Sequence, residues 1–137
     1  MQYVILVSGQ PLALACLSSA AEATQAALIC GEGGAYHFDM HNDAVRVRID
    51  APHSDLFDWK DEPERLARLK QLGTEALVYV MHYKEVNRLK AILVALARCS
   101  NFILDDDFDI FVSGSEFVAL SEAHPNGNRW WLGGHYA

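Results

Sequence analysis

The chain has 137 residues, of which 51% are apolar and 21% are charged, and its formal net charge is −7. This composition is typical of a globular protein and excludes a disordered chain, so we expect residues 1–137 to form a single domain. The negative charge disfavours binding to nucleic acid or to a membrane surface, and it favours partners with basic surfaces.

The N-terminal segment begins with a predicted strand. Residues 2–7 form an apolar, β-branched run that Ser-Gly-Gln-Pro closes as a turn. Residues 12–17 fit either a second strand or the first turns of a helix. Ser19 and Glu22 have the spacing of a capping box, which predicts a helix from about Ala20 to Cys30.

The glycine-rich segment Gly31-Glu32-Gly33-Gly34 has two interpretations. A loop of this composition can bind phosphate when a strand precedes it and a helix follows it. The predicted order here is a helix and then a strand, so we interpret the segment as the stop of the preceding helix.

Residues 36–50 predict a β-hairpin with a turn at Asn42-Asp43. Apolar and polar residues alternate along both arms. The resulting register pairs apolar residues on one face and places Asp39 opposite Arg46 on the other.

The polar face of this hairpin is the sharpest candidate for a metal site. His37, Asp39, His41 and Asp43 are metal-ligand types at i, i+2 spacing and would share one face of a strand, with the first three as the main candidates. The alternative is a solvated face on which Arg46 already pairs with Asp39, and two arginines beside the site would repel a cation. We prefer the solvated face and expect no metal and no other cofactor.

The loop that follows mixes acids with large aromatic residues. Asp55 and Asp58 flank Phe57, and Trp59 comes next. Such aromatics either anchor a protein partner or pack down as a lid on the core while the acids stay in water, and both uses are compatible.

A second helix is predicted after this loop. Asp61 and Glu64 have capping-box spacing, and Pro63 is tolerated in a first turn. Leucines at 66, 69 and 72 form one apolar side, and the helix is expected to end at Gly73.

Residues 75–111 are the most apolar part of the chain and predict a strand, a helix and a strand. The apolar run at 76–81 fits a central strand that is buried on both faces. Apolar residues at 86, 89, 93 and 96 form the sheet-facing stripe of the helix. Residues 102–104 then return to the core as a strand.

Four acids follow that strand: Asp105, Asp106, Asp107 and Asp109. With Glu116 they match most of a calcium-binding EF-hand loop. However, isoleucine stands where that loop needs glycine, and strands flank the segment instead of helices. We therefore expect a tight acidic turn between two strands, with several carboxylates in one exposed place.

The C-terminal part predicts a short helix and an aromatic tail. Ser113 and Glu116 form a capping-box pattern that opens the helix, and His-Pro-Asn-Gly at 124–127 ends it. Because neighbouring residues of a strand face opposite sides, one of Trp130 and Trp131 is expected to pack inwards while the other is exposed. A subunit interface at this pair is an alternative.

Cysteine usage and the N-terminus favour a cytoplasmic protein. Cys16, Cys30 and Cys99 are odd in number, far apart and without Cys-x-x-Cys spacing, so we expect free thiols in a reducing cytoplasm. No basic segment precedes an apolar one at the N-terminus, which argues against a signal peptide. The longest apolar run falls far short of the roughly 18 residues that span a membrane.

The sequence contains no motif of a known catalytic site. It lacks a nucleophile elbow, a P-loop, His-Glu-x-x-His and zinc-ribbon spacing, so we do not expect an enzyme.

The segment from Tyr79 to Leu120, which includes FILDDDFDIFVSGSEFVAL, resembles small bacterial immunity proteins of polymorphic toxin systems. The shared pattern is a helix, an apolar strand, an acidic turn and a short capped helix. The resemblance implies a cytoplasmic protein that binds and occludes a cognate secreted toxin.

We therefore expect an α+β domain with a mainly antiparallel sheet of four to six strands and helices mostly on one face. The expected function is inhibition of a toxin with a basic surface, by a monomer or a homodimer. The alternative is a small-ligand or metal-binding domain, with or without enzymatic activity, that uses His37, Asp39 and His41. The expected partner-binding residues are Asp105, Asp106, Asp107 and Asp109, with Asp55, Asp58 and Trp59 second.

Overall fold

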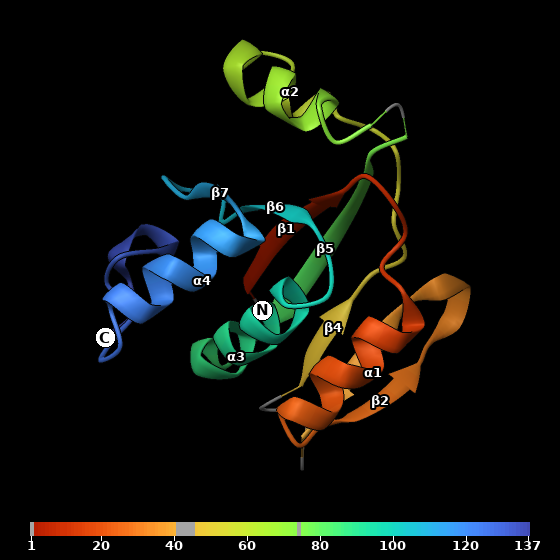
Figure 1. Cartoon of the computed structure of the whole chain (residues 1–137), viewed down its shortest axis with the longest axis vertical. Coiled ribbons are helices and arrows are strands. Elements are labelled where there is room, and N and C mark those ends of the chain that lie inside the picture. Colours follow the sequence, from red (N-terminus) through yellow and green to blue (C-terminus); the bar gives the residue numbers. More distant parts are fainter. Residues whose placement is uncertain (1, 41–45, 74) are drawn as a thin grey trace.

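The computed structural model describes residues 2–40, 46–73 and 75–137. Within this part of the chain, seven strands form one antiparallel sheet and four α-helices pack against it (Figure 1). The predicted α+β class is confirmed, with one strand more than the upper expectation. The strands are β1 (Gln2–Ser8), β2 (Ala27–Cys30), β3 (Tyr36–Asp39), β4 (Val47–Ile49), β5 (Leu77–Tyr83), β6 (Phe102–Asp105) and β7 (Phe111–Ser113); the α-helices are α1 (Leu14–Ala23), α2 (Pro63–Lys70), α3 (Val86–Ala97) and α4 (Gly114–Ala123).

The sheet has the order β2-β3-β4-β5-β1-β6-β7, so β5 is its middle strand. The apolar run at 76–81 predicted this position, and β5 pairs with β1 along its whole length and with β4 near its end. Strand β1 lies between β5 and β6 and is likewise buried over most of its length. The two long apolar strands therefore form the centre of the sheet, and short strands form its edges.

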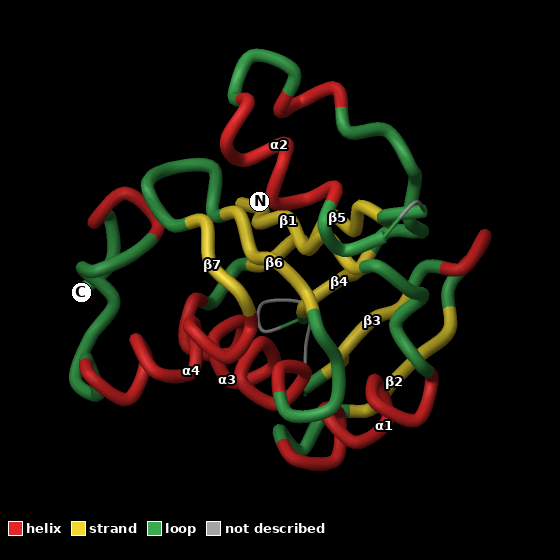
Figure 2. Tube along the Cα trace, turned by 45° about the horizontal axis from the view of Figure 1, so that its top comes forward, coloured by secondary structure: helices red, strands yellow, loops and turns green. Residues whose placement is uncertain are grey.

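The two faces of the sheet are covered unequally (Figure 2). Helices α1, α3 and α4 lie together on one face and enclose the larger core, which includes Leu17, Leu93 and Phe117. Helix α2 and a 3₁₀ turn at Phe57–Trp59 lie on the other face over a smaller cluster that contains Trp59 and Leu69. The expectation of helices mostly on one face is confirmed.

The predicted helix from Ala20 to Cys30 is wrong. Helix α1 begins at Leu14 and ends at Ala23, and residues 27–30 form β2, which pairs with β3. Ser19 lies inside the helix, because Cys16, Leu17, Ala20 and Ala21 form a buried stripe that packs as one helical face. The capping-box spacing is therefore coincidental, and the ambiguous segment 12–17 belongs mainly to the helix.

The glycine segment consequently has a different role from the predicted helix stop. It joins β2 to β3 through a 3₁₀ turn at Glu32–Gly34, in which Gly33 and Gly34 have φ angles of 66° and 92°. Glycine adopts such angles without the clash that a Cβ would cause. The segment is a hairpin connection, with strands on both sides.

The predicted register of the 36–50 hairpin is confirmed. Phe38 lies opposite Val47, and Arg46 forms an ion pair with Asp39 at 3.5 Å. The predicted turn at Asn42-Asp43 lies outside the described residues.

Helix α2 begins with Pro63 in its first turn, as predicted, but not with the predicted cap. Its N-cap residue is Glu62, and no side chain bonds to the first turn, so the Asp61–Glu64 capping box is wrong. The proline fixes the helical φ and has no N–H that needs a partner, which lowers the need for a cap.

The C-terminal part agrees with the prediction for its helix, but Trp130 is less exposed than predicted. Ser113 and Glu116 form the predicted reciprocal capping box at the start of α4. Trp131 is buried at 1% exposure and packs edge-on against Phe117, whereas Trp130 is only partly buried. Because Trp131 belongs to the core of this chain, its side chain is unavailable for the alternative of a subunit interface.

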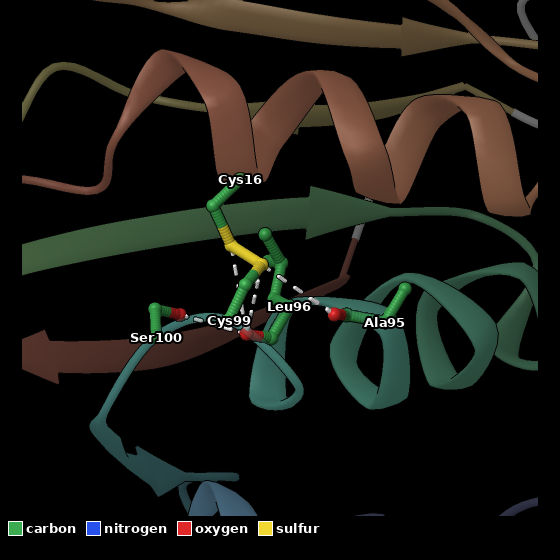
Figure 3. Close-up of a disulfide and its surroundings, with 5 residues drawn as sticks. All are labelled: Cys16, Ala95, Leu96, Cys99 and Ser100. Atoms are coloured by element: carbon green, nitrogen blue, oxygen red, sulfur yellow. Dashed lines mark hydrogen bonds between the residues drawn. A yellow bond between two sulfur atoms is a disulfide. The ribbon is translucent and has the colours of Figure 1, made fainter.

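A disulfide corrects the prediction of free thiols. Cys16 of α1 is bonded to Cys99, which follows α3, and their Cα atoms lie 5.7 Å apart (Figure 3). The 83-residue separation hides this proximity in the sequence, because packing of α1 against α3 creates it. Cys30 is a free, exposed cysteine.

No helix among residues 2–40, 46–73 and 75–137 combines the length and apolar character that crossing a membrane requires.

Candidate functional site: an acidic cleft

Three distant segments of the chain meet around a cleft of about 340 Å³. Strand β1, the 3₁₀ turn with the start of α2, and the turn between β6 and β7 each contribute to its walls. We call this site the acidic cleft, and its lining residues are Tyr3, Ile5, Asp58, Trp59, Glu62, Arg65, Asp105, Asp107 and Phe108.

Asp105 lies at the inner end of the cleft and is held by fixed donors. The indole N–H of Trp59 donates to Oδ2 of Asp105 at 2.7 Å, and the backbone N–H of Asp107 donates to Oδ1 at 2.8 Å. Asp105 is 6% exposed, and a carboxylate at that depth requires such partners. The charge of Asp105 is therefore built into the wall of the cleft.

Arg65 is the single cation among the lining residues. Its Nη1 lies 3.8 Å from Oδ2 of Asp105 and its Nε lies 3.6 Å from Oε1 of Glu62, while its guanidinium stacks over the ring of Phe111. These contacts hold Arg65 against the wall. It offsets one of the four lining carboxylates, so the cleft keeps an excess of negative charge.

The pKa of Tyr3 responds to this excess of negative charge. Its hydroxyl donates to Oδ2 of Asp107 at 3.4 Å. The negative charge of Asp107, followed by partial burial and by this hydrogen bond, raises the pKa of the Tyr3 phenol, and Asp58 and Asp105 add to the effect. The same excess of negative charge would attract the cationic side chain of a partner to the cleft beside Tyr3.

Exposed aromatic rings lie at the rim of the cleft. Tyr3 is 42% exposed and Phe108 is 47% exposed, although large apolar side chains are usually covered. Phe108 rests against Gly133 and makes an edge contact with the ring of His135. Phe57, at 60% exposure, directly precedes the lining residue Asp58. The site therefore combines carboxylates with aromatic surface.

The structure brings together four of the seven residues expected to bind a partner: Asp58, Trp59, Asp105 and Asp107. Two of these differ from the expectation of exposed contacts. Trp59 is 1% exposed and packs down as predicted for a lid, with Asp105 buried beneath it, whereas Phe57 is 60% exposed and does not pack down as predicted. Asp58 and Asp107 are exposed and accessible to a partner.

The prediction that Asp106 is an exposed partner contact is wrong, because this residue is buried and has a structural role. It is 1% exposed, and its Oδ2 accepts the backbone N–H of Leu132 at 2.7 Å while Oδ1 accepts those of Phe108 and Ile110. Burial raises the pKa of this carboxyl, and the three backbone bonds partly oppose the increase. Asp106 thus fastens the acidic turn to the C-terminal tail.

Asp55 and Asp109 are exposed but do not line the acidic cleft. Oδ1 of Asp55 accepts the backbone N–H of Phe57 at 2.9 Å, which fixes the start of the 3₁₀ turn. The predicted exposed acidic turn is therefore confirmed for Asp107 and Asp109 and wrong for Asp105 and Asp106.

Sequence reasoning missed Tyr3, Glu62, Arg65 and Phe108. The position of Phe108 among acids at a turn was a usable signal, because a large apolar side chain at a turn tip is unusual. Tyr3, Glu62 and Arg65 carried no local signal. They reach the cleft through the pairing of β1 with β6 and the placement of α2 over the sheet.

The hairpin face proposed for a metal lies elsewhere on the sheet. Asp39 is paired with Arg46 and His37 lies opposite Arg48, as predicted for the alternative to a metal site. These side chains are half-buried, so the face is less solvated than predicted. The remaining candidate, His41, lies outside the described residues. Among the described residues, no three histidine, cysteine, aspartate or glutamate side chains are grouped to hold a metal ion.

Comparison with protein-family models, with curated proteins and with solved structures found no match to this chain.

Proposed function

We propose that this protein is an immunity protein, a stoichiometric inhibitor that binds a cognate bacterial toxin through the acidic cleft. The observation that supports the proposal is the convergence of carboxylates and exposed aromatic rings from three distant segments at one cleft. Partner-binding surfaces commonly combine such anchors with complementary charge. The proposed contact residues are Tyr3, Asp58, Glu62, Asp107 and Phe108.

The net charge of −7 and the carboxylates of the cleft favour a partner with a basic surface. Many toxins that act on nucleotides or nucleic acids carry basic clefts, and an acidic inhibitor is attracted to them over several ångströms of water. A lysine or arginine side chain of the toxin would replace its hydration with the carboxylates of Asp58 and Asp107. The aromatic rings of Tyr3 and Phe108 would contribute cation–π and apolar contact around it.

The test compares three forms of the protein as bait. The wild type, the cleft variant D58N/E62Q/D107N and the control variant E22Q/E32Q/E122Q are immobilised, exposed to lysate of the source bacterium at low salt, and eluted with a salt step. Both variants lose three negative charges, but the control residues are exposed glutamates away from the cleft. Asp107 has a φ of 67°, which asparagine tolerates well, so the cleft variant should fold normally.

A stoichiometric partner retained by the wild type and the control but lost by the cleft variant supports the proposal. The purified partner should then lose its toxic activity at a one-to-one ratio. Its affinity should fall at least tenfold, about 1.4 kcal/mol, for the cleft variant, and the salt dependence should flatten. A partner that the cleft variant holds equally well contradicts the cleft, and the absence of any partner under all growth conditions contradicts the inhibitor function.

A further inference from the structure

The two halves of the Cys16–Cys99 disulfide differ in their access to solvent. Cys16 is 4% exposed and lies in the core between α1 and α3. Cys99 is exposed and lines a cleft of about 480 Å³ on a different part of the molecule from the acidic cleft. Figure 3 shows the bond bridging α1 to the residue that follows α3, and the sulfur of Cys99 is part-buried whereas that of Cys16 is buried.

The cleft beside Cys99 has a predominantly polar lining. Gln10, Gln71, Ser100 and Asn101 are among its lining residues. Gly9 also lines it and lies so close to the backbone carbonyl of Leu72 that a Cβ would clash there. Such a lining offers hydrogen bonds to a small peptide-like molecule.

We propose that the Cys16–Cys99 bond is a thiol–disulfide exchange site whose substrate is a small peptide thiol of the glutathione class. Exchange requires a thiolate to reach one sulfur of the disulfide, and access decides which sulfur is attacked. The cleft makes Cys99 the attacked sulfur and leaves Cys16 as the leaving group. This inference does not depend on the toxin-binding function.

The exchange balances with two thiols as the reductant. The first thiolate attacks Sγ of Cys99, the S–S bond breaks, and its electron pair leaves on Cys16, which takes a proton from solvent. The product is a mixed disulfide between Cys99 and the thiol. A second thiolate attacks the sulfur of the bound thiol and releases Cys99, so two thiols become a disulfide while the protein becomes a dithiol.

The atoms around the disulfide can also accommodate the two thiols that reduction would produce. The carbonyl oxygen of Leu96 lies 3.7 Å from both sulfurs, and that of Ala95 lies 3.8 Å from Cys99. Each thiol formed by reduction would thus have a carbonyl acceptor nearby, and the desolvation cost of a buried S–H is small.

Reduction would release the covalent link between α1 and the end of α3 without removing the apolar contacts of Leu17 and Ala20. The reduced protein should keep its fold but melt earlier. From the length of the closed loop, we expect a decrease of the midpoint temperature by about 10–15 °C.

The experiment follows reduction of the disulfide in the variant C30S, in which the exposed third cysteine is absent. The protein is incubated with glutathione at pH 8 and increasing urea below the unfolding transition, then trapped with acid, alkylated and analysed by mass spectrometry. If glutathione attacks the folded protein, the rate of disulfide reduction is proportional to the glutathione concentration and independent of the urea concentration. The trapped mixed disulfide is then on Cys99. A rate that increases steeply with urea shows that the bond opens only in the unfolded chain and overturns the proposal.

Two single-thiol variants test the same point without reduction. C16S/C30S retains only Cys99, and C30S/C99S retains only Cys16. With oxidised glutathione, Cys99 should react faster than Cys16 by roughly a hundredfold, because a buried thiol is far less reactive than an accessible one. Equal rates, a mixed disulfide on Cys16 in the first experiment, or purified C30S protein that lacks the disulfide would each overturn the proposal.

Discussion

The indole N–H of Trp59 donates to the carboxylate of Asp105 across 2.7 Å, and both side chains are almost completely buried. The two residues are 46 positions apart and belong to different elements, the 3₁₀ turn before α2 and strand β6. This bond fixes the aromatic wall of the acidic cleft to its deepest charge. This contact therefore links the shape of the cleft to part of its negative charge.

Replacing Trp59 with phenylalanine should destabilise the protein more than the same replacement at Trp131. Both indoles are buried and both donate a hydrogen bond, but the acceptor of Trp131 is the neutral amide of Asn128 at 3.1 Å. Loss of a bond to a charged acceptor costs about 1.5–3 kcal/mol, against about 1 kcal/mol for a neutral one. Urea unfolding of W59F and W131F measures the difference. Equal costs would contradict a charge-assisted bond at Asp105.

Removing the charge of Asp107 should lower the pKa of Tyr3. The negative charge of Asp107 is the largest cause that raises this pKa, because it disfavours the phenolate. The variant D107N retains an acceptor for the hydroxyl but loses the charge. NMR titration of the tyrosine ring carbons measures the change. The variant D109N is the control, because Asp109 is in the same turn but outside the cleft, and it should leave Tyr3 unchanged.

Asp106 should make a contribution to the free energy of unfolding that decreases as the pH rises. Its pKa is raised in the folded protein, chiefly by burial, so the folded state binds this proton more tightly than the unfolded state does. The favourable contribution is complete below the ordinary aspartate pKa and is lost as the pH rises through the folded value.

The variant D106N tests this sign. It replaces an acceptor of the Leu132 N–H with an amide group and should be less stable than the wild type at pH 4 by about 1–3 kcal/mol. Because the contribution of Asp106 declines with pH, the difference should become smaller between pH 4 and pH 7. Urea unfolding of both proteins across this range measures it, and a difference that grows would show that the pKa of Asp106 is lowered.

Removing the cap of α4 should cost about 1 kcal/mol. In S113A the backbone N–H of Glu116 loses the Ser113 hydroxyl that accepts from it at 3.1 Å. S121A is a matched control in the same helix, since the Ser121 hydroxyl has no hydrogen-bond partner in the described residues and should be replaceable without loss. Thermal unfolding compares the two variants. If S121A were as damaging as S113A, the effect would not be due to the cap.

The parts of the fold that the sequence predicts well are those in which the local pattern and the packing agree. The register of the 36–50 hairpin follows from alternation alone, and β5, α3 and β6 follow from long apolar patterns. The prediction for residues 20–30 was wrong because the local pattern and the packing disagree in this segment. Ser19 and Glu22 carry a local signal for a helix start, but the buried stripe of α1 began earlier. Strand β2 is a short edge strand with mostly exposed side chains, so alternation gave no sign of it.

The acidic cleft was predictable only in part, because its partners come from distant sequence. The concentration of acids at 105–109 and the aromatics at 57–59 were visible locally, and the structure unites them. That Asp105 and Asp106 are buried depends on Trp59 and Leu132, and no local pattern reports those contacts. The disulfide was hidden for the same reason. Spacing between cysteines gives no information about the distance between two packed helices.

The position of β1 in the sheet has a consequence for the order in which the protein can be made. Both neighbours of β1 lie far downstream, since Leu6 pairs with Tyr79 on one side and with Leu104 on the other. During synthesis, the apolar strand β1 therefore leaves the ribosome long before its partner strands β5 and β6 have been made. We expect the nascent chain to need protection by a chaperone during that interval, and the central sheet to assemble late and slowly because its contacts are so distant in sequence.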